Sequence, residues 1–188
     1  YICEHVEITP CRAGGTGVMS ALKGQPDAYP WRMEFGTVNT MGVSGLLAAQ
    51  KWIADSGGVE AIYEHEMRHA KRLHEGLSAI DGVKLYCADL DHDHLPVFVF
   101  NIDGMPADQT GTFLDVEHDI ITRTGLHCAP QVHEGIGTFE TDGTVRFSPG
   151  VFTTDEEVER AIEAVAETAE IGQERIGAAK QPVLATNA

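Results

Sequence analysis

The stretch Pro96-Val97-Phe98-Val99-Phe100-Asn101-Ile102 decides the fold prediction, because it is the strongest strand signal in the chain. β-branched and aromatic residues dominate it, and both kinds favour extended backbone. Weaker strand signals surround it, and apolar residues recur at helical spacing elsewhere in the chain. The sequence therefore predicts strands at 83–86, 96–102, 120–123 and 144–148, and helices at 42–56, 59–80, 107–117 and from residue 153 or 154 onward.

The order of these elements predicts the fold class. It reads helix, helix, strand, strand, helix, strand, strand, helix, so too few strands alternate with single helices for a doubly wound parallel sheet. An α/β fold of the α+β kind, with helices packed on one face of a small, mostly antiparallel sheet, fits better. A further short strand is expected at residues 2–8, and a frayed tail after about residue 177.

The composition is that of a globular protein of ordinary size. Of its 188 residues 43% are hydrophobic and 22% are charged, and the formal net charge is −16 at pH 7. An acidic surface repels phosphate backbones, which argues against a nucleic-acid partner. No apolar stretch approaches the roughly 18 residues that a membrane helix needs, which argues against a membrane partner.

The cysteines and the first residues bear on the cellular compartment. The four cysteines form no C-x-x-C pair and no framework of the secreted kind, so we expect free thiols in a reducing cytoplasm. The first residues show no signal-peptide pattern and no initiating methionine, so we expect the chain to begin in mid-sequence or after processing.

Two groups of histidines can be considered as metal ligands. His92-Asp93-His94 is one group, and the helical i, i+4 pair of His65 and His69 is the other. Neither has an obvious third ligand, and we expect no metal site.

The segment Arg123-Thr124-Gly125-Leu126-His127-Cys128-Ala129-Pro130 is the richest in chemistry. It joins a cysteine to a histidine and an arginine in a loop that glycine and proline keep irregular. Neighbouring cationic groups favour the thiolate, which is the reactive form of cysteine. The alternative is a buried structural cysteine, which is common in proteins.

Other segments can bind anions. Arg146 lies inside an apolar strand and must find an anion or a solvent opening, so it is either a fork for a substrate carboxylate or half of a structural salt bridge. Gly36-Thr37 and Gly14-Gly15-Thr16-Gly17 can offer backbone amides and a hydroxyl to a phosphate, or they are plain turns.

Taken together and in this order, these segments resemble the class V aminotransferase superfamily, and within it the cysteine desulfurase and selenocysteine lyase branch. Arg123–Pro130 is similar to that branch's Arg-x-Gly-x-His-Cys-Ala motif around the persulfide-forming cysteine. The other matching segments are the Gly-rich loop, Phe35–Asn39, the Pro96–Asn101 strand and the strand of Arg146 with the Thr-Thr-Asp-Glu-Glu helix start after it.

The resemblance implies a domain plan and a cofactor. The chain would be the C-terminal part of a fold type I transferase that depends on pyridoxal phosphate. Residues 1–40 would end the large domain, residues 41–176 would form the small domain with its connecting helices, and residues 177–188 would be a tail.

The resemblance also implies roles for individual residues. Cys128 would attack the sulfur of L-cysteine and become a persulfide, leaving alanine. Arg146 would bind the substrate carboxylate, with Arg123 and His127 lining the same site. Thr37, next to Gly36, would donate to the cofactor phosphate, across a homodimer interface.

The family's cofactor lysine has no counterpart in this sequence. That lysine follows a Ser-x-His, and none of the lysines here has this context, namely Lys23, Lys51, Lys71, Lys84 and Lys180. Because Schiff-base chemistry needs it, the chain alone is expected to be inactive.

Partners and alternatives follow from the same resemblance. The partners would be L-cysteine, a second copy or a separate N-terminal half, and a sulfur-acceptor protein, in a context such as iron–sulfur cluster assembly. The alternatives are a selenocysteine lyase, a class V aminotransferase, or a non-catalytic module for dimerisation or for binding a sulfur carrier.

Overall fold

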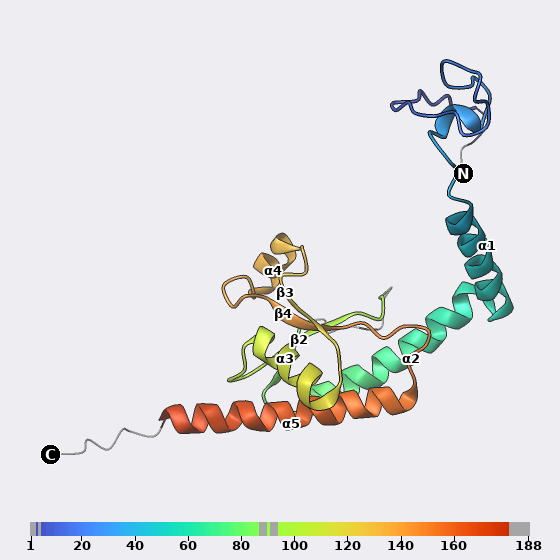
Figure 1. Cartoon of the computed structure of the whole chain (residues 1–188). Coiled ribbons are helices and arrows are strands. Elements are labelled where there is room, and N and C mark those ends of the chain that lie inside the picture. The colour runs from blue at the N-terminus through green and yellow to red at the C-terminus, as the bar shows by residue number, and fades with distance from the viewer. Residues whose placement is uncertain (1–2, 4, 87–89, 91–93, 181–188) are drawn as a thin grey trace. The chain divides into compact units, whose positions relative to one another are not determined.

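The computed structural model describes residues 3, 5–86, 90 and 94–180 of the chain (Figure 1). The chain divides into two compact units, Tyr1–Ser56 and Gly57–Ala188. None of the helices in the described part is both long and apolar enough to cross a lipid bilayer.

The first unit is mostly irregular and ends in a helix. A short 3-10 helix, η1, spans Trp31–Met33, and α1 spans Thr40–Asp55. Asn39 caps α1 by accepting a hydrogen bond from the amide of Gly42 at 2.9 Å. The strand predicted at residues 2–8 is wrong, because residues 3 and 5–56 contain no strand. The expected domain border at 40/41 stays a prediction.

The second unit is built on one four-stranded sheet. Its strands are β1 (Val83–Leu85), β2 (Phe98–Ile102), β3 (Arg123–Gly125) and β4 (Thr144–Phe147), in the order β1-β2-β4-β3. All three strand pairs are antiparallel. The predicted small, mostly antiparallel sheet is therefore confirmed, and in these strands it is antiparallel throughout.

Three long helices cover one face of this sheet (Figure 1). They are α2 (Gly58–Ser78), α3 (Ala107–His118) and α5 (Asp155–Lys180), whereas the short α4 (Pro130–Ile136) follows β3. The core between sheet and helices is mainly apolar, and burial of its apolar side chains accounts for most of the driving force for folding. Its main members are Leu73, Leu77, Phe100, Ile102, Leu114, Val145, Phe147, Val158 and Val165.

Alternation along the strands separates an apolar face from a polar face. In β2 the side chains of Phe98, Phe100 and Ile102 are buried, so the residues between them point to the opposite face of the sheet. In β4 the same alternation directs Arg146 away from the helices. The face of the sheet opposite the three long helices therefore carries the polar residues from which a site can be built.

Local capping fixes where α5 begins. The amide of Thr154 donates to Oε2 of Glu157 at 2.8 Å, and the amide of Glu157 donates to Oγ1 of Thr154 at 3.2 Å. This reciprocal capping box confirms that Thr154 is the N-cap, as one of the two predicted threonines. α5 continues to Lys180, beyond residue 177, where the sequence places the start of the tail. Residues 181–188 lie outside the described part.

Two elements differ from the prediction. The third strand lies at Arg123–Gly125 rather than at 120–123, because α3 ends in a left-handed residue, Asp119, and the chain after it is still irregular. The helix α4 was not predicted, since its seven residues are too few to show a periodic pattern.

Candidate functional site

The loop after β3 holds its backbone in an uncommon conformation. His127 and Cys128 both have positive φ angles, 53° and 58°, and the amide of Ala129 donates to the carbonyl of Leu126 at 2.8 Å. This is the pattern of a type I′ turn, in which glycine, asparagine or aspartate normally occupy the central positions. A left-handed residue other than glycine costs about 1–2 kcal/mol, so the surroundings must hold this turn in place.

The turn presents the thiol of Cys128 to solvent. Cys128 is an exposed free cysteine, so the alternative of a buried structural cysteine is wrong. The guanidinium of Arg123 donates a hydrogen bond to its Sγ at 3.3 Å. A donor with a full positive charge at this position favours a sulfur that carries negative charge.

A second guanidinium, that of Arg146, lies on the strand next to that of Arg123. Arg146 is the register partner of Arg123 on the neighbouring strand. Its side chain is half-buried, and its Nε is buried without a hydrogen-bond partner. No carboxylate of the described residues forms an ion pair with it, so the alternative of a structural salt bridge finds no support there. Two adjacent guanidinium groups repel each other, and a bound anion would relieve that repulsion.

His127 interacts electrostatically with both guanidinium groups. Its Nε2 is hydrogen-bonded to Oγ1 of Thr144 at 3.1 Å, and its Nδ1 is buried without a partner. Burial lowers the pKa of the imidazole, and the positive charge of Arg146 and, to a smaller extent, His133 and Arg123 lower it further. The ring is therefore neutral at neutral pH.

A close backbone contact between Gly143 and the residues just before the turn supports the turn. Nδ2 of Asn101 donates to the carbonyl of Gly143 at 3.1 Å. Gly143 has a φ of 90°, and a Cβ on it would overlap the backbone of Gly125 and the amide of Leu126. Only glycine allows this approach, so Gly143 belongs to the support of the loop even though it carries no functional group.

Sequence reasoning missed several residues of this group. His133, Thr138, Thr144, Asn101 and Gly143 all support the loop, and none was predicted as a site residue. One signal was available, because Pro130 at the first helical position and Gly137 after the last are typical helix ends. A helix predicted there would have placed His133 one turn beyond Cys128.

The predicted anion-binding segments of the first unit also meet. The amide of Gly36 donates to the carbonyl of Gly15 at 2.6 Å. A Cβ on Gly17 would overlap the carbonyl oxygen of Gly36, so the two segments approach as closely as glycine allows. Thr37 follows with an exposed side chain. The adjoining hollow of about 310 Å³ is lined by Gly14, Gly15, Thr16, Gly17, Ser20, Leu22, Lys23 and Gly24.

The structure thus gathers the predicted site residues into two groups. Cys128, Arg123, His127 and Arg146 lie together in the second unit, and Gly36 with Thr37 lies in the first unit.

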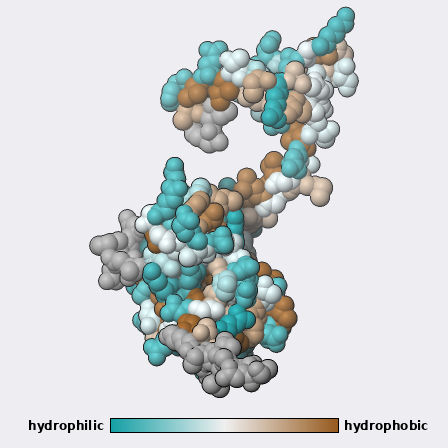
Figure 2. All heavy atoms as spheres, turned by 90° about the vertical axis from the view of Figure 1, so that its left-hand side faces the viewer, coloured by the Kyte–Doolittle hydropathy of each residue, from teal (hydrophilic) through white to brown (hydrophobic). Residues whose placement is uncertain are grey.

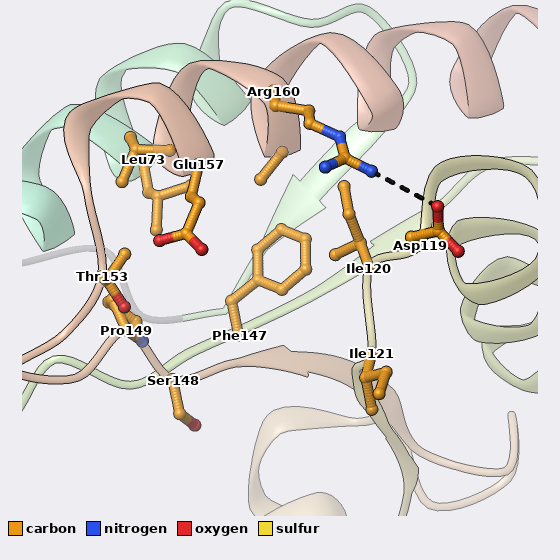
Figure 3. A pocket seen from close by; sticks show the side chains of 12 residues that line it. Leu73, Asp119, Ile120, Ile121, Phe147, Ser148, Pro149, Thr153, Glu157 and Arg160 are labelled. Atoms are coloured by element: carbon orange, nitrogen blue, oxygen red, sulfur yellow. Dashed lines mark ion pairs between the residues drawn. The ribbon is translucent and has the colours of Figure 1, made fainter.

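A cavity elsewhere in the second unit is unrelated to the cysteine loop. Figure 3 shows it between α5, the end of β4 and the segment after α3, with a volume of about 280 Å³. Phe147 and Ile120 form apolar walls, and the ion pair of Arg160 with Asp119, at 3.9 Å, lies beside it. None of the predicted site residues lines this cavity.

The helical histidine pair has other partners than a metal. His65 is hydrogen-bonded to the carbonyl of Thr153 at 3.0 Å, and the buried His69 to Asp155 at 2.9 Å. The described residues contain no cluster of three or more His, Cys, Asp or Glu side chains that could hold a metal ion. Residues 92 and 93 of the His92-Asp93-His94 group lie outside the described part.

Known proteins resemble this chain over most of its length. It is 32% identical over 171 residues to a probable cysteine desulfurase of Methanothermobacter thermautotrophicus, covering 88% of this chain and 41% of the relative. It is 35% identical over 165 residues to a probable cysteine desulfurase 2 of Mycobacterium leprae, covering 86% of this chain and 38% of the relative. The chain therefore spans about two fifths of the length of these curated relatives.

Structural similarity gives the same result. The apo structure of a cysteine desulfurase from Thermococcus onnurineus NA1 superposes with a TM-score of 0.73 at 33% identity, covering 86% of this chain and 39% of that chain. The profile of the family described as aminotransferase class-V matches residues 4–161. This match covers both units and confirms the predicted fold and resemblance: the chain belongs to the aminotransferase class-V family.

Proposed function

We propose that this chain is the C-terminal portion of a cysteine desulfurase that depends on pyridoxal phosphate. One observation carries the proposal: an exposed thiol, Cys128, lies in a strained turn next to the guanidinium of Arg123, while Arg146 beside it has a buried Nε without a partner. A nucleophile and an unneutralised carboxylate-binding group are the two elements that sulfur removal from an amino acid requires.

Two separate groups of residues in this chain suit chemical groups of the cofactor and of the substrate. The glycine contact beside Thr37 offers backbone amides and a hydroxyl suited to a phosphate, and the arginine pair suits a carboxylate. We propose that another polypeptide segment supplies the Schiff-base lysine, because none of the lysines in this sequence follows a Ser-x-His. The chain alone is then inactive.

The proposed reaction transfers one sulfur atom to this chain. The thiolate of Cys128 attacks the sulfur of bound L-cysteine, so that an S–S bond forms and the Cβ–S bond of the substrate breaks. The electron pair of that bond remains with the substrate, whose carbon takes up a proton and leaves as alanine. When bound, pyridoxal phosphate supplies the electron sink for this cleavage.

The surrounding residues have positioning roles in this step. Arg146 holds the substrate carboxylate and thereby fixes where the substrate sulfur lies. His127, whose buried Nδ1 has no partner, would be a neutral hydrogen-bonding group in this step. Arg123 stabilises the charge on the attacking sulfur.

The exposed apolar residues of the first unit suggest that it associates with another polypeptide. No residue of α1 is buried, and Met41 and Leu47 are 85% and 67% exposed. Brown, apolar atoms appear among the polar ones on the surface drawn in Figure 2. Such surface is typically covered in a complex, and we propose that a second copy or the N-terminal part of the enzyme covers it, in the cytoplasm.

Among the alternatives, the exposed thiol argues against a plain aminotransferase, which has no use for a nucleophilic cysteine. Sulfur and selenium substrates would use these side chains in the same way. Activity of one preparation toward L-cysteine and toward selenocysteine therefore distinguishes a desulfurase from a selenocysteine lyase. A sulfur-acceptor protein would take the sulfur from the exposed turn.

The test combines the mass and the absorbance of the purified protein. A second polypeptide with the absorbance of bound pyridoxal phosphate indicates a complete desulfurase. Incubation with L-cysteine should then add one sulfur atom to Cys128, and a Cys128→Ala variant should lose this addition while a Cys11→Ala variant keeps it. A colourless single species that gains no sulfur when mixed with pyridoxal phosphate and L-cysteine agrees with the inactivity proposed for the chain alone. Sulfur addition at another cysteine, or undiminished addition in Cys128→Ala, contradicts the proposal.

A further inference from the structure

The conformation of the cysteine turn needs a support that the turn itself does not contain. His127 and Cys128 both adopt left-handed backbone angles, and the turn is closed by one backbone hydrogen bond. Neither residue type tolerates this conformation as glycine does. Neighbouring side chains must therefore exclude the relaxed alternatives.

His133 on α4 supplies such a support. Its ring is only 2% exposed, and its centroid lies 5.4 Å from that of His127 with an interplanar angle of 46°. The ring of His127 is held on another side by the hydroxyl of Thr144. These contacts limit the rotation of His127, and the backbone of the turn moves with that residue.

The ring of His133 is itself firmly held. Its Nδ1 is hydrogen-bonded to Oγ1 of Thr138 at 2.7 Å, and Thr138 is completely buried. Its amide donates to the carbonyl of Ala129, the residue that follows Cys128. A buried histidine costs more to desolvate than an apolar residue of similar size, so packing alone gives no reason for a polar ring here.

We propose that His133 is a positioning residue for the thiol of Cys128: its buried ring, fixed by Thr138, holds His127 and thereby the turn that keeps Sγ beside Arg123. The sulfur-accepting role of Cys128 rests on the proposed function, whereas the geometric link between His133 and the thiol does not.

The experiment measures the reactivity of the thiol without pyridoxal phosphate or L-cysteine. In the full chain, Cys3, Cys11 and Cys87 are replaced by serine, so that iodoacetamide modifies Cys128 alone. Rate constants for alkylation at pH 7 are compared for Arg123→Ala, His133→Gln and the double variant. Because the thiolate reacts, losing one exposed charge-assisted contact should slow alkylation about two- to fivefold.

Coupling between the two substitutions distinguishes positioning from a general structural role. If His133 keeps the thiol beside Arg123, either single variant loses the contact and the double variant is no slower than the slower single one. A structural role would instead give factors that multiply. Multiplying factors, or an unchanged rate in His133→Gln, would overturn the proposal.

Two further variants guard against misfolding and unspecific effects. Thr138→Val keeps the side-chain volume but removes the hydroxyl that holds the His133 ring, so it should also slow alkylation. It replaces His133→Gln in the comparison if that variant fails to fold. An unchanged rate in Thr138→Val would then count against the proposal. Glu134→Gln, at the next and exposed position of α4, should leave the rate unchanged. If sulfur transfer from L-cysteine fails while the coupling is observed, only the desulfurase proposal is refuted.

Discussion

Gly143→Ala should destabilise the second unit and displace the turn that carries Cys128. The added Cβ would overlap the backbone carbonyl of Gly125, which cannot move without shifting β3 against β4. Alanine is also strained at the φ of 90° found here. The conformational cost is about 1–2 kcal/mol and the overpacking cost about 1–3 kcal/mol, so the free energy of unfolding should fall by roughly 2–5 kcal/mol.

Urea denaturation followed by circular dichroism measures this loss. With a slope of about 1–3 kcal/mol per molar urea, the midpoint should fall by about 0.7 M or more. Gly135→Ala is the matched control, since a Cβ there meets no atom and its φ is not positive. Alanine is favoured over glycine in a helix by about 0.5–1 kcal/mol, so the control should be unchanged or slightly more stable. A Gly143→Ala variant with the midpoint of the parent chain would refute the close approach of the two backbones.

Other predictions concern titration and the helix packing. Hydrogen bonds from the amide and, to a smaller extent, the hydroxyl of Thr154 lower the pKa of Glu157 below its usual 4.5. The ionised carboxylate therefore stabilises the fold fully above pH 4.5, and this stabilisation is lost as the pH falls through the lowered pKa. Glu157→Gln should flatten this pH dependence in acid unfolding curves. Arg146→Ala should raise the pKa of His127, because it removes the largest charge effect, and NMR titration of the ring would show the shift. The lowered pKa of His127 also means that stability is lost as pH falls from its usual 6.5 toward the lowered value. His69→Ala should cost about 2–4 kcal/mol in urea unfolding, because it removes a buried ring and its hydrogen bond.

Much of the fold could be predicted because its main elements carry strong local patterns. The strand around Phe100 and the helix with Leu73 and Leu77 inward are confirmed, since their apolar residues form the core. The third strand was misplaced because Ile120 and Ile121 resemble strand residues, although Ile121 is 87% exposed and only Ile120 packs against the core. Local propensity does not distinguish these two cases.

The site was predictable only where the residues carry reactive groups. Cys128 and Arg146 stand out as a thiol and a charge in unexpected surroundings, and the structure brings them together. The contributions of Thr138 and Gly143 depend on contacts that appear only in the folded chain: a buried hydroxyl bonded to His133, and a missing side chain that lets Gly143 approach Gly125 and Leu126. No sequence period indicates such contacts. The roles of all these residues in sulfur transfer stay predictions.

Because β3 lies at the edge of the sheet, the length of the loop after it can change during evolution. β3 has a single neighbouring strand and only three residues, so the pairing of β1 with β2 and of β2 with β4 does not depend on it. Residues inserted or removed between Gly125 and Pro130 would change how far the thiol reaches while β1 and β2 kept all their hydrogen bonds. The reach of the thiol can therefore change while the pairing of β1 with β2 stays the same.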